Sequence, residues 1–495
     1  MNSMLIQDVL VVTPAAEPIR RDILIEDGII AAIALPGTLN AEAATCLEAS
    51  DLIAIPGLVN AHTHGHANLA KGSADRWLLE ASLVNGAWMG GGRDAETAYL
   101  STLIGAIDMI SKGTTSCFDL VYGFPLPDPI QFAAVAQAYA DAGMRAVLAP
   151  MVADRTLFDS VPGLRARLGE HLDDAGETKA PDADAILSAL DAILALPLPQ
   201  GISRGLAPTI PHQCSDALIT GCSDLARRHG LPLHMHIAES RPQVEIAHDV
   251  YGRSPVAHLD TLGVLGDHFV AAHAIWLDAS DLDMLGQSGA CMVHIPASNL
   301  RLGSGAAHIR PALERNITVA LATDGANSSD ALNMFEAMRL ASGISRLFGS
   351  PRADWLDKSE PFAMATAGGA RVLGYADTGS LAPGMAADLV LLDGTSIAFT
   401  PLNDPLNQIV TAENGSSVTH VMVGGRLVVK DGKPTGVDLS EVRARLAAVW
   451  PAYHARIAAQ KHRSLSLEPV VIDFVQSRKG AQLSFERFIA GEASR

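Results

Sequence analysis

Alternation of apolar runs with helical segments is the sequence feature that most constrains the fold of this chain. In the middle of the chain, the strand-like run TTSCFDL is followed by the helical FAAVAQAYADAG and then by the strand-like RAVLAPM. Such alternation favours βα units around a parallel sheet. About 330 residues carry this pattern, enough for a (β/α)8 TIM barrel with insertions.

The two ends of the chain have a different texture. MLIQDVLVV, DILIEDGIIAAI and DLIAIPG near the start, and DLVLLDG and THVMVGGRLVVKDGK near the end, predict short strands joined by turns. We therefore expect residues 1–55 and 385–440 to form one composite β-sandwich beside a barrel of residues 56–384. The run VRARLAAVWPAYHARIAAQ then predicts a helical C-terminal extension over 441–495.

Composition and charge exclude several classes of protein. Lys and Arg number 36 against 54 Asp and Glu, a formal charge of −18, and such an acidic surface repels nucleic acid. The five scattered cysteines contain no CxxC pair, which favours a reducing compartment over a disulfide framework. No signal-peptide pattern and no apolar stretch of roughly 18 residues occurs, so we expect a cytoplasmic protein without a membrane partner.

A pair of histidines follows the apolar run LIAIPGLVNA. His62 and His64 are separated by one residue, so on a strand both rings point to the same face and can chelate one metal ion. The alternative is a pair of ordinary histidines at a strand end.

Three further strand ends carry titratable side chains. LPLHMHIAES contains His236 with Glu239 three residues later, HFVAAHAIWL contains His273, and ITVALATDGANSS contains Asp324. His234 is expected one layer deeper, in a structural role. Each residue alone has a plain alternative, such as a core histidine or a helix N-cap. Because the carboxyl ends of all barrel strands open on one face, the set together favours a single active site.

The chain resembles the amidohydrolase superfamily, in its cytosine-deaminase-like branch. That branch includes adenosylhomocysteine, guanine and 8-oxoguanine deaminases and triazine hydrolases. The motifs that carry the resemblance are PGLVNAHTH, LHMHIAES, AAHAIWL, HIPASNLRLGSG, LATDGANSS and GMAADLVLLD.

The resemblance implies a role for each strand-end residue. One divalent metal ion, zinc first and iron second, would be held by His62, His64, His236 and Asp324. Glu239 would be the proton shuttle and His273 would orient the hydroxide formed at the metal, while Asp324 would take the proton of the water. That hydroxide attacks an sp² ring carbon.

Two departures from the family pattern concern the stretch GISRGLAPTIPHQCSD. It has no lysine, whereas binuclear relatives use a carboxylated lysine there, and this favours a single ion. Thr209 replaces the usual substrate-contacting histidine, and His212 stands where tyrosine is usual, which argues against a nucleoside substrate.

Side chains around the predicted site are candidates for contacts with the substrate. His66, Arg76 and Trp77 lie in the segment after the first predicted barrel strand and could bind a ring by hydrogen bonding and stacking, and Asn299 is expected to support the site. Their alternative is an ordinary loop role. With Thr209 and His212 they complete the substrate-binding set.

The leading hypothesis is hydrolytic deamination of a purine-, pterin-, pyrimidine- or triazine-like ring, with release of ammonia. The separate zinc cytidine-deaminase signature, HxE with PCxxC, is absent from the sequence. A first alternative is dechlorination of a triazine, or opening of a cyclic amide, at the same site. A second alternative is a catalytically inactive barrel that serves as a binding module. The expected partner is a small heterocycle, and self-association into a homo-oligomer stays open.

Overall fold

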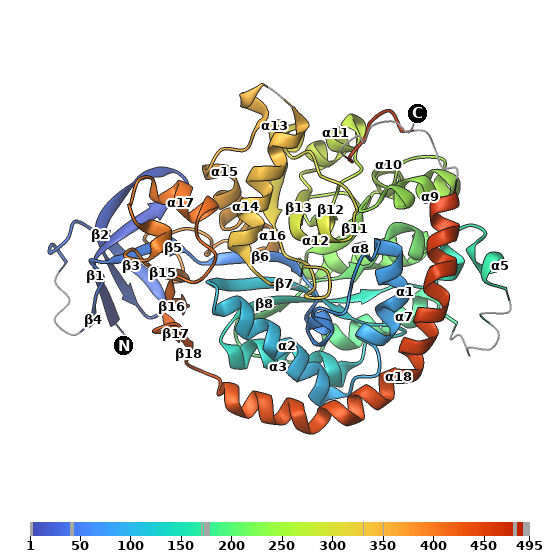
Figure 1. Ribbon diagram of the computed structural model, residues 1–495, viewed down its shortest axis with the longest axis horizontal. Helices are drawn as coiled ribbons and strands as arrows, with labels where there is room; N and C mark the ends of the chain where they lie inside the picture. Colours follow the sequence, from blue (N-terminus) through green and yellow to red (C-terminus); the bar gives the residue numbers. More distant parts are fainter. Residues whose placement is uncertain are drawn as a thin grey trace.

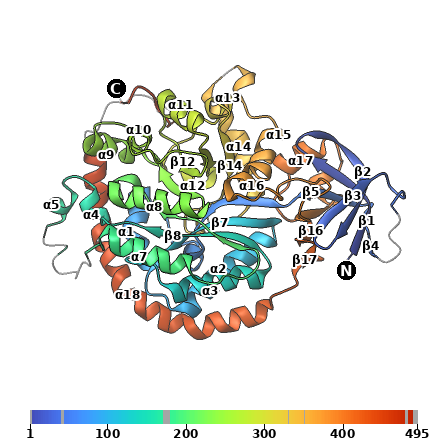
Figure 2. The same cartoon turned by 180° about the vertical axis from the view of Figure 1, so that it is seen from behind.

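A computed structural model describes residues 3–39, 44–169, 172, 179–329, 331–349, 351–478 and 483–488. Its two main parts are a barrel wrapped in helices and a separate β-sheet at one end of the molecule (Figures 1 and 2). The barrel confirms the predicted fold class.

The barrel strands form a five-stranded and a four-stranded parallel sheet. They are β6 (Leu58–Thr63), β7 (Thr114–Tyr122), β8 (Arg145–Val152), β9 (Ile202–Arg204), β10 (Ala207–Pro208), β11 (Leu233–Ile237), β12 (Phe269–His273), β13 (Cys291–His294) and β14 (Thr318–Leu321). Because β9 and β10 both pair with β8, one after the other, the two sheets supply the eight positions of a TIM barrel.

Backbone hydrogen bonds join the two sheets at both edges. The His234 N–H donates to the Leu206 carbonyl over 2.8 Å, and the Asp324 N–H donates to the His62 carbonyl over 3.0 Å. Side chains at alternate positions fill the interior, as Phe118 and Leu120 do on β7. Strands buried on both faces explain why the sequence shows continuous apolar runs here.

Helices cover the outside of the barrel. Their apolar faces pack on the strands, and polar residues begin several of them, as Ser215, Ser240 and Asp278 accept hydrogen bonds from the first helical turn. The α-helices are α1 (Leu79–Gly90), α2 (Ala95–Ile110), α3 (Pro129–Ala142), α4 (Leu157–Ser160), α5 (Leu164–Leu168), α7 (Ala183–Leu194), α8 (Asp216–His229), α9 (Arg241–Tyr251), α10 (Pro255–Thr261), α11 (Ala279–Ser288), α12 (Pro296–Arg301), α13 (Arg310–Glu314), α14 (Met334–Ser345), α15 (Ser359–Met364), α16 (Ala367–Leu373) and α17 (Pro405–Thr411). Short 3-10 helices include η1 (Gly65–Ala70), η2 (Pro211–Gln213), η3 (Arg346–Phe348), η4 (Arg352–Asp354) and η5 (Ile397–Phe399).

Strands from both chain ends join in one nine-stranded sheet. The first group is β1 (Ser3–Thr13), β2 (Ala16–Glu26), β3 (Ile29–Ala34), β4 (Thr45–Glu48) and β5 (Leu52–Pro56), and the second is β15 (Leu389–Asp393), β16 (Val418–Val423), β17 (Arg426–Lys430) and β18 (Lys433–Pro434). The antiparallel pairing of β5 with β15 unites them, from Leu52 opposite Asp393 to Pro56 opposite Leu389. One apolar core draws side chains from both groups, among them Ile23 and Leu389.

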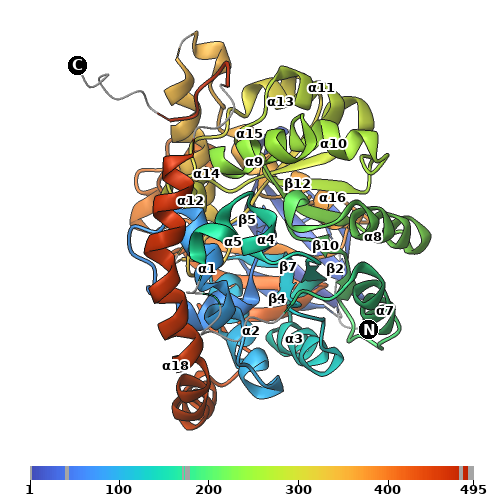
Figure 3. The ribbon, with the colours of Figure 1, turned by 90° about the vertical axis from the view of Figure 1, so that its right-hand side faces the viewer.

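The predicted C-terminal extension contains one 39-residue helix, α18 (Leu439–Ser477). It starts beside the end sheet, runs along the barrel and rises past α1, as Figures 1 and 3 show. It packs against α1, α2 and α5. Residues 479–482 and 489–495 of the extension lie outside the described residues. Within the described chain, no helix combines the length and apolarity that a membrane span requires.

Candidate metal and active site

The histidines and the aspartate of the predicted cluster lie at or just beyond the ends of four barrel strands. His62 lies near the end of β6 with His64 just beyond it, His236 lies on β11, and His273 ends β12. Asp324 follows β14 by three residues. Their strands all end at the same rim of the barrel, so the side chains meet there.

Unusual backbone angles aim some of these side chains. His273 and Asp324 have φ values of 63° and 69°, in the left-handed region that residues other than glycine rarely adopt. Ala238, between His236 and Glu239, has a φ of 49°. The turn at Ala238 lets His236 and Glu239 face the same space. Strained backbone of this kind persists where the surrounding structure holds it and is common at functional sites.

The spacing of the polar atoms fits a metal ion. The Oδ1 atom of Asp324 lies 3.7 Å from Nε2 of His62 and 3.3 Å from Nε2 of His64, and the Nε2 atoms of His64 and His236 are 3.4 Å apart. The Nε2 atom of His62 is buried without a hydrogen-bond partner among the described residues. Burial lowers the pKa of His62 to about 3, which keeps the ring neutral, the form that binds a metal. The donor set of three imidazoles and a carboxylate suits a divalent transition metal.

The other ring nitrogens of the histidines are held by the protein. Nδ1 of His64 lies 3.1 Å from the Leu120 carbonyl, and Nδ1 of His236 lies 3.0 Å from the Thr209 carbonyl. Nδ1 of His62 lies 3.0 Å from Nε2 of His234. Partners of this kind fix the tautomer and the orientation of a ligating imidazole.

Asp324 is also oriented by hydrogen bonds. Its Oδ2 atom accepts from the hydroxyls of Ser298 and Ser328 over 2.6 and 3.0 Å, and Oδ1 accepts from the Gly325 N–H over 2.7 Å. These donors point Oδ1 toward the histidines.

Glu239 lies beside the cluster. Its Oε2 atom is 3.5 Å from Nε2 of His273, and its side chain is almost fully buried. Burial raises the pKa of the Glu239 carboxyl well above its usual range, and the charges of Asp324 and Glu80 act in the same direction. Nδ1 of His273 in turn lies 2.9 Å from the Asn299 side-chain oxygen. A buried carboxyl that favours its protonated form is suited to donating a proton.

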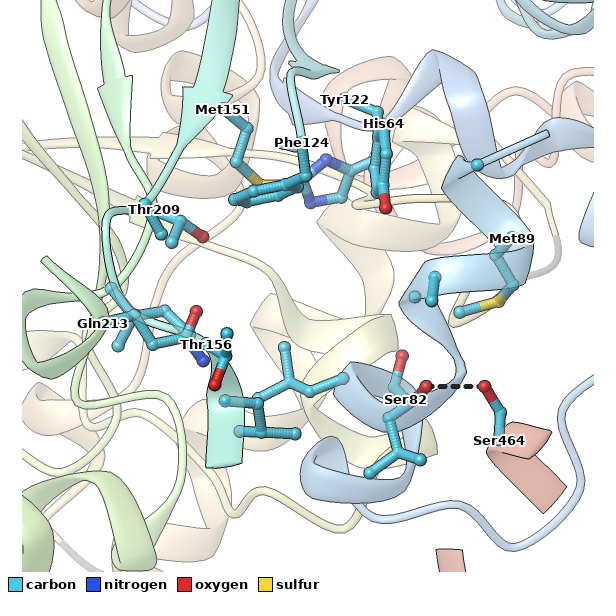
Figure 4. Close-up of a pocket in the computed structure, with 18 of the residues that line it drawn as sticks. His64, Ser82, Met89, Tyr122, Phe124, Met151, Thr156, Thr209, Gln213 and Ser464 are labelled. Atoms are coloured by element: carbon cyan, nitrogen blue, oxygen red, sulfur yellow. Dashed lines mark hydrogen bonds between the residues drawn. The ribbon is translucent and has the colours of Figure 1, made fainter. Parts of the chain in front are cut away.

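The cluster opens into a cavity of about 550 Å³. Near His64 its wall is formed by Tyr122, Phe124 and Met151, and Thr209 and Gln213 face it from another side (Figure 4). The rings of Tyr122 and Phe124 lie edge to face, with centroids 5.2 Å apart. An aromatic and thioether wall beside polar groups suits a flat, partly polar ring.

A model of the amidohydrolase family matches residues 53–428, most of the chain. The chain belongs to the amidohydrolase family. This confirms the family predicted from the motifs and the prediction that the protein is a hydrolase.

Curated relatives of this amidohydrolase carry deaminase names. A 5'-deoxyadenosine deaminase from Methanopyrus kandleri is 33% identical over 392 residues, which is 79% of this chain and 84% of the relative. A 5-methylthioadenosine/S-adenosylhomocysteine deaminase from Syntrophobacter fumaroxidans is 33% identical over 439 residues, 86% of this chain and 91% of the relative.

Solved structures with the same fold include two that contain zinc. An adenosine deaminase from Xanthomonas campestris with bound zinc superimposes with a TM-score of 0.75 at 27% identity, covering 92% of this chain and 99% of that one. An atrazine chlorohydrolase from Arthrobacter aurescens TC1, in complex with zinc, has a TM-score of 0.79 at 24% identity, over 90% and 99% of the two chains. At that identity the second likeness shows the fold alone.

Only some of the six residues predicted to bind substrate line the cavity of this amidohydrolase. His66 and Thr209 line the cavity, whereas Asn299 lies behind His273 and His212 is buried away from the lining.

The expectation that Arg76 and Trp77 contact the ring is not met. Neither lines the cavity: the Arg76 side chain is 92% exposed, and Trp77 packs into an apolar cluster with Leu79 and Trp88. The segment after β6 forms η1 and α1, and Arg76 and Trp77 lie in the bend between them, where Trp77 packs into the core and Arg76 faces solvent.

Several lining residues were not anticipated. Tyr122, Met151 and Gln213 follow or end barrel strands, a position that could have singled them out. Further unexpected lining residues come from α18: Gln460, Arg463, Ser464 and Leu467. Nothing in the local sequence indicates that this helix reaches the barrel mouth.

Proposed function

We propose that this protein is a metal-dependent aminohydrolase that exchanges an amino group on a nitrogen heterocycle for oxygen and releases ammonia. The observation that carries the proposal is the meeting of the His/Asp cluster with the buried carboxyl of Glu239 at the mouth of one cavity. The deaminase names of relatives that are 33% identical over most of their length support the same reaction class.

One divalent ion, zinc by preference and iron as the alternative, would be held by His62, His64, His236 and Asp324. When bound, the ion supplies Lewis acidity that activates the attacking water. The zinc in the Xanthomonas deaminase structure supports this choice of metal. The absence of lysine from the stretch GISRGLAPTIPHQCSD supports a single ion.

Glu239, His273 and Asp324 would manage the protons. Glu239 delivers one proton to a ring nitrogen as water attacks the adjacent carbon. It then takes the proton of the added hydroxyl and carries it to the leaving amine, which departs as ammonia. Asp324 accepts the first proton that the water loses and returns it to Glu239 when the product leaves. His273, held by Asn299, hydrogen-bonds the attacking oxygen and keeps it directed at the ring.

The heterocycle would lie against Tyr122, Phe124 and Met151, with its polar edge toward His66 and Thr209. Thr209 offers a hydroxyl where adenosylhomocysteine deaminase-like proteins usually have a histidine, so the substrate is expected to differ from theirs beyond the ring. His212 has a supporting role in this proposal, because it lies outside the lining.

An ammonia-release screen of zinc-loaded protein over aminopurines, aminopterins, aminopyrimidines and aminotriazines tests the proposal. Ammonia in equimolar amount with the oxo product supports deamination. If no amine releases ammonia, deamination is rejected. Release of chloride from a chlorotriazine would then support dechlorination, and a new carboxylate from a cyclic amide would support ring opening. Protein that takes up no metal and turns over no compound would support the inactive binding module. A cytoplasmic location and a homo-oligomer also stay proposals, tested by cell fractionation and light scattering.

A further inference from the structure

The outer part of the cavity wall comes from α18. Its lining residues are Gln460 and the residues three, four and seven positions after it, Arg463, Ser464 and Leu467. This spacing places them on one helix face, toward the cavity. This face, here called the α18 wall, lies outside residues 53–428 that match the family model.

The α18 wall is fixed in position. The Ser464 hydroxyl donates to the Val84 carbonyl of α1 over 2.9 Å, the hydrogen bond drawn in Figure 4. One turn later, Leu467 packs with Leu164 and Leu168 of α5. In Figure 4, Ser464 lies on the opposite side of the drawn cavity from His64. The wall thus faces whatever substituent extends away from the ring.

Charges divide the cavity into two ends. Its acidic lining residues are Glu239 and Asp324, both at the metal cluster, whereas its basic lining residues, histidines aside, are Arg155, Lys179 and Arg463. Figure 4 places Thr156 and Ser464, the sequence neighbours of two of these cations, away from His64. The acidic side chains of the lining thus lie at the metal cluster, and the cationic ones belong to other parts of the described wall.

The side chain of Arg463 has hydrogen-bond donors that no described residue uses. Its Nε and Nη2 atoms are buried and have no hydrogen-bond partner within the part of the chain that the structure describes. These two nitrogens share one edge of the guanidinium, and that edge matches the two oxygens of a carboxylate. A buried N–H without an acceptor costs free energy, so a ligand oxygen at this edge would be bound favourably.

We propose that Arg463 binds an anionic oxygen group, such as a carboxylate, on the substrate, so that α18 selects heterocycles carrying a negatively charged substituent. This inference rests on the proposed function for the ring end of the cavity. It makes Arg463 a specificity-determining residue supplied by the C-terminal helix.

The test compares ring-matched pairs that differ by one carboxylate. Suitable pairs are adenosine with its 5'-carboxylate, pterin with its 6-carboxylate and cytosine with its 5-carboxylate. Zinc-loaded wild-type protein, Arg463→Gln and Arg463→Lys are compared, with Arg443→Gln as the matched control because Arg443 is an exposed residue of the same helix. Affinity is measured as KM where ammonia is released and as Kd by calorimetry where it is not.

For at least one ring we expect the carboxylated member to bind more tightly, and Arg463→Gln to weaken that binding about 10- to 100-fold, the range of a charge-assisted pair of hydrogen bonds. Arg463→Lys should lose part of this, and the neutral member, the zinc content and Arg443→Gln should change less than about two-fold. If no carboxylate improves binding, or if Arg463→Gln weakens both members equally, the inference is wrong. Ammonia release from neutral members alone would leave the proposed function standing. Binding of a carboxylated member that depends on Arg463, without ammonia release from any compound, would support the inference and contradict the proposed function.

Discussion

Replacing Glu239 by glutamine separates proton transfer from metal binding. Glutamine keeps the shape of the side chain and cannot exchange a proton at neutral pH. Glu239 is beside the cluster, 3.5 Å from His273, and is not one of the proposed ligands. The metal content should therefore stay at the wild-type value.

The size of the effect follows from the two proton transfers assigned to Glu239. A positioned general acid or base contributes about 10²–10⁴ in rate. Because both transfers use the same carboxyl, the slower one limits turnover, and kcat should fall at least about 100-fold. Burial disfavours the charged carboxylate of Glu239, as the direction of its pKa shift shows, so the neutral amide should not lower the melting temperature.

The assay is ammonia release at saturating substrate, with zinc measured by elemental analysis and unfolding by scanning calorimetry. Glu245→Gln is the control: Glu245 is a mostly buried glutamate on α9 that pairs with Arg241 and does not line the cavity. It should keep kcat within about two-fold. A Glu239→Gln protein with its metal and a kcat within about five-fold of wild type would refute the assigned role.

Three further outcomes are expected. Zinc-loaded protein should contain about one ion per chain, and a chelator should abolish activity until zinc returns; two ions per chain, with activity following the second, would contradict the single site. His236→Ala should lose the metal and Asp324→Asn should retain part of it, because the amide is a weaker ligand; elemental analysis that found full metal in both would reject this ligand set. Trp77→Ala should leave KM unchanged and lower the free energy of unfolding by about 3–5 kcal/mol, since Trp77 packs in the core; a raised KM with full stability would show that Trp77 contacts the substrate after all.

The residues of the site could be predicted more completely than the details of the fold, because a TIM barrel fixes where its strands end. His62, His236, His273 and Asp324 each follow an apolar run, and the carboxyl ends of barrel strands converge whatever the loops between them do. Knowing the strand order was therefore enough to bring these side chains together.

The substrate contacts did not follow in the same way. Trp77 and Arg76 are neighbours in sequence, but a φ of 51° at Arg76 and the start of α1 send them to opposite environments. That turn is set by packing and not by composition. Arg463 is still harder to anticipate, because its place in the cavity depends on contacts between α18 and α1 that lie far apart in the sequence.

The hydrogen bond between Ser464 and Val84 spans 380 residues of sequence, and this separation has a consequence during synthesis. At the usual rates of translation, roughly 20 to 80 s pass between the emergence of the two residues. The first barrel strand, β6, precedes Val84, and the other barrel strands leave the ribosome within that interval, so the barrel can close while the mouth of its cavity lacks one side. The nascent chain can thus form the His/Asp cluster before the α18 wall is in place.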